Sequence, residues 1–83
     1  MNDNKDLNSE ELLFFEFSKG SILESAGRDD LAIQCYYNCK TICEKLVYNH
    51  PDRALPYMGI GSVFFYSNEF GLALRAFIKV LII

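Results

Sequence analysis

The stretch YMGIGSVFFYSNEFGLALRAFIKV, residues 57–80, carries the strongest structural signal in this chain of 83 residues. It contains no proline, and the polar pair Asn68-Glu69 interrupts its apolar residues, which predicts two helices joined by a short reversal. Gly61 in the first helix and Ala73 in the second are small enough for two antiparallel helices to touch there. The stretch is therefore predicted to form a helical hairpin.

The residues before this stretch predict another pair of helices. Residues 9–25 contain recurring apolar and small side chains without proline, and Asn8 or Ser9 is able to cap that helix. Gly27 supplies a left-handed position at which the chain reverses. A second helix is expected to follow over about residues 29–48, with acidic residues at its start.

Two prolines mark the boundary between the two pairs. Pro51 disfavours helix at the residue before it, and Asp52 is able to cap the helix that follows. The third helix is expected over about residues 53–67, with Pro56 in its opening turn, and the fourth from about residue 70 to the end. Because no segment alternates with the period of a β-strand, the chain is predicted to be all-α.

The two predicted hairpins are copies of each other at a shift of 41 residues. The aligned pairs are Gly20 with Gly61, Leu23 with Phe64, Gly27 with Asn68, Leu31 with Leu72, Ala32 with Ala73, Ile33 with Leu74, Tyr36 with Phe77, and Cys39 with Val80. The predicted organisation is a polar tail (1–8), a first hairpin (9–48), a linker (49–53) and a second hairpin (54–83).

The second copy resembles the tetratricopeptide repeat, in which aromatic, large apolar and small residues recur at fixed spacing on two antiparallel helices. The matching residues are Tyr57, Ile60, Gly61, Phe64, Phe70, Ala73, Phe77 and Val80. The first copy matches at Gly20, Leu23, Gly27, Ala32 and Tyr36, but Glu16 and Lys19 stand where the second copy has Tyr57 and Ile60. It therefore resembles a divergent, capping repeat, and the whole resembles a segment of an α-solenoid built from α-α hairpins.

The repeat length and the boundary sequence are similar to the kinesin-light-chain variety of this family, whose repeats begin with HPD-x-A-x-x-Y. Here that motif is His50, Pro51 and Asp52, followed by Ala54 and Tyr57. The resemblance implies a repeat boundary at His50 and a place in a cytoskeletal or ciliary assembly. The polar, acidic start MNDNKDLNSEE (1–11) does not read as a secretory signal, so a cytoplasmic location is expected.

The family resemblance also implies a partner-binding groove on the first helix of each hairpin. The groove positions carried across are Phe17, Ser21, Met58, Ser62, Phe65 and Tyr66. They are apolar or weakly polar, which departs from the Lys and Asn pattern of repeats that hold carboxylate tails of heat-shock chaperones. The same side chains fit equally well beneath a further repeat or another subunit.

Composition and motifs exclude several classes of function. A net charge of -3 with scattered cations predicts no binding to nucleic acid or to a membrane surface. Cys35, Cys39 and Cys43 lie on one helix face and are expected to be reduced, since this spacing suits no disulfide framework. We expect core packing or a partly exposed thiol, since no second cluster of ligands completes a zinc site. The Gly59-x-Gly61 pair lacks the strand and third glycine of a phosphate loop. We expect no catalytic residue, no metal and no cofactor.

The end of the chain, RAFIKVLII (75–83), is apolar and lacks a helix-ending glycine. Two repeats with an apolar edge predict a stack that a further repeat or another protein completes. The expected function is that of a non-catalytic binding module or scaffold. A chaperone that shields an apolar client segment is the alternative, and an enzyme that depends on the cysteines or on a metal is the hypothesis from another class.

Overall fold

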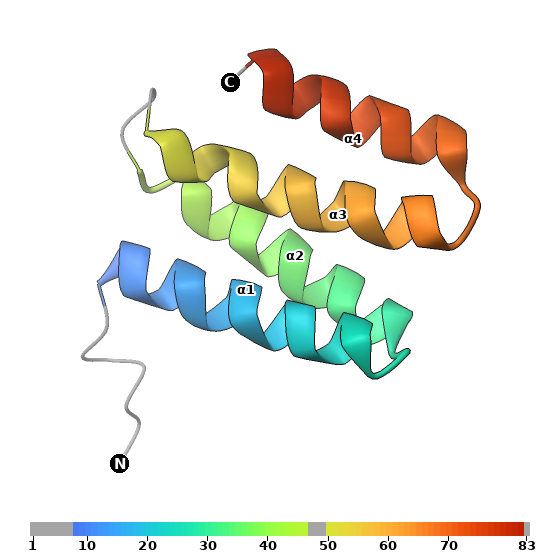
Figure 1. Cartoon of the computed structure of the whole chain (residues 1–83). Coiled ribbons are helices and arrows are strands. Elements are labelled where there is room, and N and C mark those ends of the chain that lie inside the picture. The colour runs from blue at the N-terminus through green and yellow to red at the C-terminus, as the bar shows by residue number, and fades with distance from the viewer. Residues whose placement is uncertain (1–7, 47–49, 83) are drawn as a thin grey trace.

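The computed structural model describes residues 8–46 and 50–82, and within them every regular element is helical. The elements are α1 (Ser9–Ser25), α2 (Asp29–Cys43), the short 3-10 helix η2 (Pro51–Ala54), α3 (Leu55–Tyr66) and α4 (Phe70–Ile82). Figure 1 shows α1 paired with α2 and α3 paired with α4, with α2 lying behind α1 and α3. The predicted all-α class and the four helices are confirmed.

The molecule is flat, because its Cα atoms extend over 40 × 30 × 13 Å. Because the Cα atoms of one helix lie on a cylinder of radius about 2.3 Å, an extent of 13 Å corresponds to two layers of helices, in agreement with the position of α2 behind α1 and α3. The contacts follow the chain order, with α1 against α2, α2 against α3 and α3 against α4, and α1 meets α3 over a smaller area. A molecule that is only two helices thick leaves many large apolar side chains exposed, most of them on α4 and on the aromatic segments of α1 and α3.

The two hairpin turns are built alike. Gly27 (φ 78°) and Asn68 (φ 65°) both have left-handed backbone, at positions that the 41-residue shift aligns. The next amide in each turn donates back to the preceding helix, from Arg28 to the Leu23 carbonyl and from Glu69 to the Phe64 carbonyl, both at 2.8 Å. These bonds satisfy carbonyls that a helix end would otherwise leave unpaired. The predicted left-handed reversal at Gly27 is confirmed, and asparagine performs the same role in the second turn.

The helix α1 begins with a reciprocal cap. The Asn8 side chain accepts a hydrogen bond from the Glu11 amide at 2.8 Å, and the Glu11 carboxylate accepts one from the Asn8 amide at 3.2 Å. Two amides of the first turn are thereby satisfied. Of the two capping residues expected from the sequence, Asn8 is the one used.

The second helix ends at Cys43 and not near residue 48 as expected, and residues 47–48 lie outside the described ranges. Three-residue turns follow it, in which Glu44, Lys45 and Leu46 donate to carbonyls three residues earlier. The Arg53 guanidinium donates to the Cys43 carbonyl at 2.7 Å and to the Leu46 carbonyl at 3.4 Å. The Arg53 side chain therefore satisfies carbonyl groups that the end of α2 leaves without a helical partner. The helix ends here although the apolar residues of the sequence continue beyond Cys43.

The start of the second hairpin also differs from the expectation. The backbone over Pro51–Ala54 is the 3-10 helix η2, and α3 begins at Leu55 with Pro56 in its first turn, as predicted for that proline. The capping side chain is His50, whose Nδ1 accepts a hydrogen bond from the Asp52 amide at 3.1 Å. The expectation that the Asp52 carboxylate caps the third helix is wrong, since α3 has no side-chain cap. Asp52 instead lies inside η2, where its own amide donates to His50.

The core consists of two connected clusters. One contains Ala32, Tyr36, Ile60, Val63 and Ala76 and joins α2, α3 and α4. The other contains Leu13, Cys39, Ile42 and Cys43 and joins α1 to α2. Phe17 packs against both clusters, and Leu23 and Phe64 pack against the first.

Glycines make room for aromatic rings at three helix contacts. A Cβ atom at Gly20 would lie 2.8 Å from the Tyr36 ring, and one at Gly61 would lie 2.4 Å from the Phe77 ring. These two contacts are equivalent under the 41-residue shift. A third was not foreseen: a Cβ atom at Gly59 would lie 2.5 Å from the same Tyr36 ring. Gly59 therefore serves the contact between hairpins, and Gly61 the contact within the second hairpin.

Three glycine-to-alanine substitutions should separate these contacts by their effect on the free energy of unfolding. Gly59→Ala should cost about 1–3 kcal/mol, because the Tyr36 ring is fully buried and has nowhere to move. Gly61→Ala should cost less, because Phe77 is partly exposed and its ring can shift. Gly71→Ala is the control, since nothing lies within 4 Å of its added methyl group, and it should leave stability unchanged or raise it by up to about 1 kcal/mol. Urea unfolding measures all three, and equal effects would contradict this assignment.

Candidate protein-binding surface

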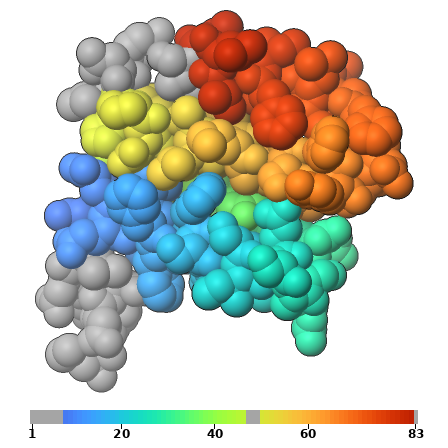
Figure 2. Space-filling model, viewed as in Figure 1, coloured from blue at the N-terminus to red at the C-terminus, as the bar shows by residue number. Residues whose placement is uncertain are grey.

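A polar network at Tyr36 ties three helices together. The Tyr36 hydroxyl of α2 donates to the Glu24 carboxylate of α1 at 2.9 Å, and the Ser62 hydroxyl of α3 donates to the other Glu24 oxygen at 2.7 Å. The Ser21 hydroxyl lies 3.3 Å from the Tyr36 oxygen and donates to it, because the single phenolic hydrogen goes to Glu24. Figure 2 shows the face to which α1 and α3 belong, with part of α2 visible between them.

This network changes the acid-base behaviour of Tyr36. Burial of the ring, which is 1% exposed, raises the pKa of Tyr36 to about 12, and the hydrogen bond to the Glu24 carboxylate acts in the same direction. The hydrogen bond from Ser21 partly opposes them. The neutral phenol is therefore the form that the fold requires.

The six groove positions carried over from the tetratricopeptide family divide into two groups. Ser21 and Ser62 are part of the Tyr36 network, and Phe17 packs on the Tyr36 ring with 5.5 Å between ring centroids. These three side chains are already engaged by the fold. The other three are exposed, and they are Met58, Phe65 and Tyr66.

The exposed aromatic residues at the end of α3 form one cluster with the start of α4. Phe65 contacts Tyr66 with 5.3 Å between ring centroids and Phe70 with 5.6 Å, both edge to face. Phe14 and Phe15 are exposed on α1. Consecutive large residues cover too wide an arc of a helix for all of them to face the core, which is why some of them are exposed in both hairpins.

The largest apolar surface belongs to α4. Toward α3 this helix buries only Ala73 and Ala76. Most of its other large apolar side chains are exposed over several turns, and we call five of them the α4 edge: Phe70, Leu74, Ile78, Leu81 and Ile82. Figure 1 shows α4 as the outermost helix of the layer, with one side that no other helix covers. The apolar sequence at the end of the chain was the signal that indicated this edge.

The three cysteines are core residues. Cys35, Cys39 and Cys43 are all buried and free, and two of them donate weak hydrogen bonds to carbonyls, Cys39 to Leu13 and Cys43 to Asp52. Burial raises the pKa of all three thiols, that of Cys39 to about 12. A reactive cysteine needs the opposite shift, so this geometry does not activate a nucleophile.

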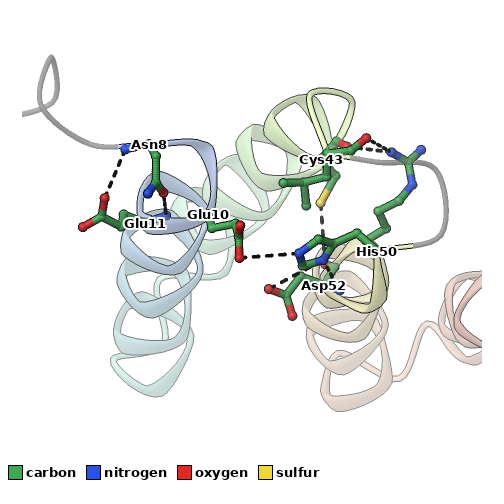
Figure 3. A network of polar contacts seen from close by, with 8 residues as sticks. Asn8, Glu10, Glu11, Cys43, His50 and Asp52 are labelled. Carbon is green, nitrogen blue, oxygen red and sulfur yellow. Dashed lines mark hydrogen bonds and ion pairs between the residues drawn. The ribbon is translucent and has the colours of Figure 1, made fainter.

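A second polar group, which sequence spacing could not reveal, surrounds His50 (Figure 3). The His50 cluster consists of Glu10 from the first turn of α1 together with His50 and Asp52. The His50 Nε2 atom lies 3.5 Å from a Glu10 carboxylate oxygen, and Nδ1 lies 3.9 Å from an Asp52 carboxylate oxygen. The cluster joins the start of the first hairpin to the start of the second.

The His50 cluster has the side chains of a metal site, but its hydrogen bonds fit a structural contact better. Because Nδ1 accepts the Asp52 amide hydrogen, the proton of the neutral imidazole lies on Nε2, facing Glu10. A metal ion at Nε2 would place that proton on Nδ1, directly opposite the amide hydrogen. The arrangement therefore favours a histidine that caps η2 and contacts Glu10.

Comparisons with protein families, with curated proteins and with solved structures found no match to this chain. Within residues 8–46 and 50–82, no helix combines the length and apolar character that crossing a bilayer requires.

Replacing the Tyr36 hydroxyl should change how stability depends on pH. Tyr36→Phe keeps the ring but removes a hydrogen bond to a carboxylate, so we expect a loss of about 1–2 kcal/mol near pH 8. A folded-state pKa of about 12 lies above the ordinary value of 10.0, so Tyr36 should make the wild type lose stability as the pH rises from 10 to 12, in addition to the loss that the buried thiols cause in both proteins. The difference in stability between wild type and variant should change by roughly 3 kcal/mol across that window, so that the variant becomes the more stable protein near pH 12. Urea unfolding at several pH values measures it, and a constant difference would contradict the assignment.

The buried thiols should react slowly in the folded protein. Their raised pKa values reduce the thiolate fraction at pH 8, and burial blocks the reagent, so reaction with a disulfide reagent should follow unfolding. In denaturant all three should react at the rate of a free cysteine. One thiol reacting rapidly in the native protein would contradict the packing role and favour the thiol-dependent enzyme.

Proposed function

We propose that this chain is a non-catalytic protein-binding module, a segment of a tetratricopeptide-like array that docks on another helical unit through the α4 edge. The observation that carries the proposal is the difference between two aligned aromatic residues. Tyr36 of α2 is 1% exposed because α3 lies over it, whereas Phe77 of α4 is 38% exposed. The helix α3 thus covers Tyr36 of the first hairpin, whereas no described helix covers Phe77, the aligned residue of the second hairpin.

The way in which α2 meets α3 suggests what would fit on α4. Gly59 accommodates the Tyr36 ring, and a helix with a small residue opposite Phe77 would make the corresponding contact. Such a helix would also cover Leu74 and Ile78, which lie on the exposed side of α4. Burying large apolar side chains of this kind stabilises an interface by about 1.5–3 kcal/mol for each residue that is fully covered.

The exposed part of the expected groove provides a second contact surface for the same module. Phe65, Tyr66 and Met58 are large, apolar or aromatic, and accessible, and such residues commonly anchor partner proteins. The resemblance to kinesin-light-chain repeats favours a cytoplasmic scaffold in a cytoskeletal or ciliary assembly. A chaperone that shields an apolar client segment would use the same surfaces.

Site-specific crosslinking in cells tests the proposal. A photoreactive amino acid at Leu74 or Ile78 should form a crosslink to one neighbouring protein, identified by mass spectrometry. The matched control is the same amino acid at Ile22, an exposed apolar residue on α1 outside the α4 edge. Equal crosslinking from all three positions would contradict a specific interface.

The neighbour that is identified also separates the two forms of the proposal. A further helical repeat unit, or a subunit of a microtubule or motor assembly, would support the scaffold. A single unstable client protein would favour the chaperone. A small-molecule product formed by the purified protein would contradict both.

A further inference from the structure

A hollow of about 170 Å³ lies where α2, α3 and α4 meet. Its lining residues are Tyr37 and Lys40 from α2, Tyr57 and Ile60 from α3, and Leu72, Arg75, Ala76 and Lys79 from α4. No residue of α1 is among them, and neither the groove residues Met58, Phe65 and Tyr66 nor the α4 edge contributes to it. The hollow is therefore a separate surface from those discussed above.

The floor of the hollow is apolar and its walls are aromatic. Ile60 and Ala76 are buried in the core cluster and form part of the lining, and Leu72 is partly exposed beside them. Tyr37 and Tyr57 contribute the aromatic walls. The volume is well below the roughly 300–1,000 Å³ of pockets that hold drug-sized ligands. It suits one apolar side chain of a larger partner.

The rim of the hollow is positively charged. Lys40, Arg75 and Lys79 are three of the eight Lys and Arg residues in a chain whose net charge is -3, and no Asp or Glu lines the hollow. Among the described residues, none of the three forms an ion pair. Lys79 lies over the Tyr57 ring at 5.7 Å from its centroid, which holds its ammonium group beside the hollow.

We propose that this hollow binds a short acidic segment of a partner protein. One large apolar side chain enters between Tyr37 and Tyr57, and flanking carboxylates pair with the cations on the rim. Arg75 supplies a planar guanidinium able to bind a carboxylate through two hydrogen bonds. Three cations gathered on one face of an acidic protein are a poor match for a long phosphate backbone, whereas they match a short run of carboxylates.

The occupant of the hollow is independent of what covers α4. The proposed acidic segment binds between α2 and α4. Leu74 and Ile78 do not line the hollow, so a helix stacked on these two residues would leave the hollow open to the segment. Binding of an acidic peptide can consequently succeed or fail whether or not the crosslinks at the α4 edge appear.

Fluorescence anisotropy with the full chain tests the inference. The probe is a short fluorescein-labelled peptide with a central leucine between two runs of glutamate. Arg75→Glu combined with Lys79→Glu should weaken its binding about tenfold or more, because like charges then face each other. The matched control combines Lys19→Glu with Arg28→Glu, which changes the net charge equally at exposed cations outside the hollow. The control should bind within about twofold of the wild type.

Two further peptides, measured with the wild-type protein, test the apolar floor and the charged rim of the hollow. Replacing the central leucine of the peptide by glycine should weaken binding about tenfold, since the hollow is then empty. A peptide with lysine in place of glutamate should not bind. Three results would overturn the inference. The two double variants could lose the same affinity for the peptide, or the leucine and glycine peptides could bind equally well. A single-stranded DNA oligonucleotide could also bind more tightly than the acidic peptide.

Discussion

The insertion of the Tyr36 ring between two glycines holds the helices in register. Gly20 on α1 and Gly59 on α3 both lack the side chain that would collide with this ring, so one residue of α2 contacts the helices on either side of it. Its hydroxyl then reaches Glu24, which also accepts a hydrogen bond from Ser62. Packing and hydrogen bonding thus act through the same side chain, and this side chain joins the two hairpins.

The molecule has an open side because no described helix covers the outer side of α4. Each helix buries apolar side chains only against the helices that pack on it, and α4 packs mainly on α3, with Ala76 reaching the core cluster that includes residues of α2. The contact of Phe77 with Gly61 repeats the contact of Tyr36 with Gly20, but Phe77 lacks the covering that Gly59 gives to Tyr36. Surface of this kind in water favours association, which connects the packing of the core to the proposed binding function.

Local signals in the sequence were sufficient for the hairpins and insufficient for what lies between them. The spacing of Gly61 and Ala73 and the left-handed position at Gly27 predicted the helix pairs, because these depend on neighbouring residues. The end of α2 depends on Arg53, and the environment of His50 depends on Glu10, contacts that only the folded chain creates. Gly59 was missed for the same reason, since its role appears only when α2 lies against α3. The cations around the hollow look scattered in the sequence, because Lys40 of α2 comes close to Arg75 and Lys79 of α4 only in the folded chain.

A double-mutant cycle between Gly59→Ala and Tyr36→Leu tests whether the aromatic ring and the glycine are one unit. If the ring is what excludes a methyl group at residue 59, then Gly59→Ala should be harmful in the wild type and much less harmful once Tyr36→Leu has removed the ring. Urea unfolding of the four proteins should then give a coupling energy of about 1–2 kcal/mol, in the direction of relief. Additive effects, with a coupling energy near zero, would contradict this account of how the two hairpins are joined.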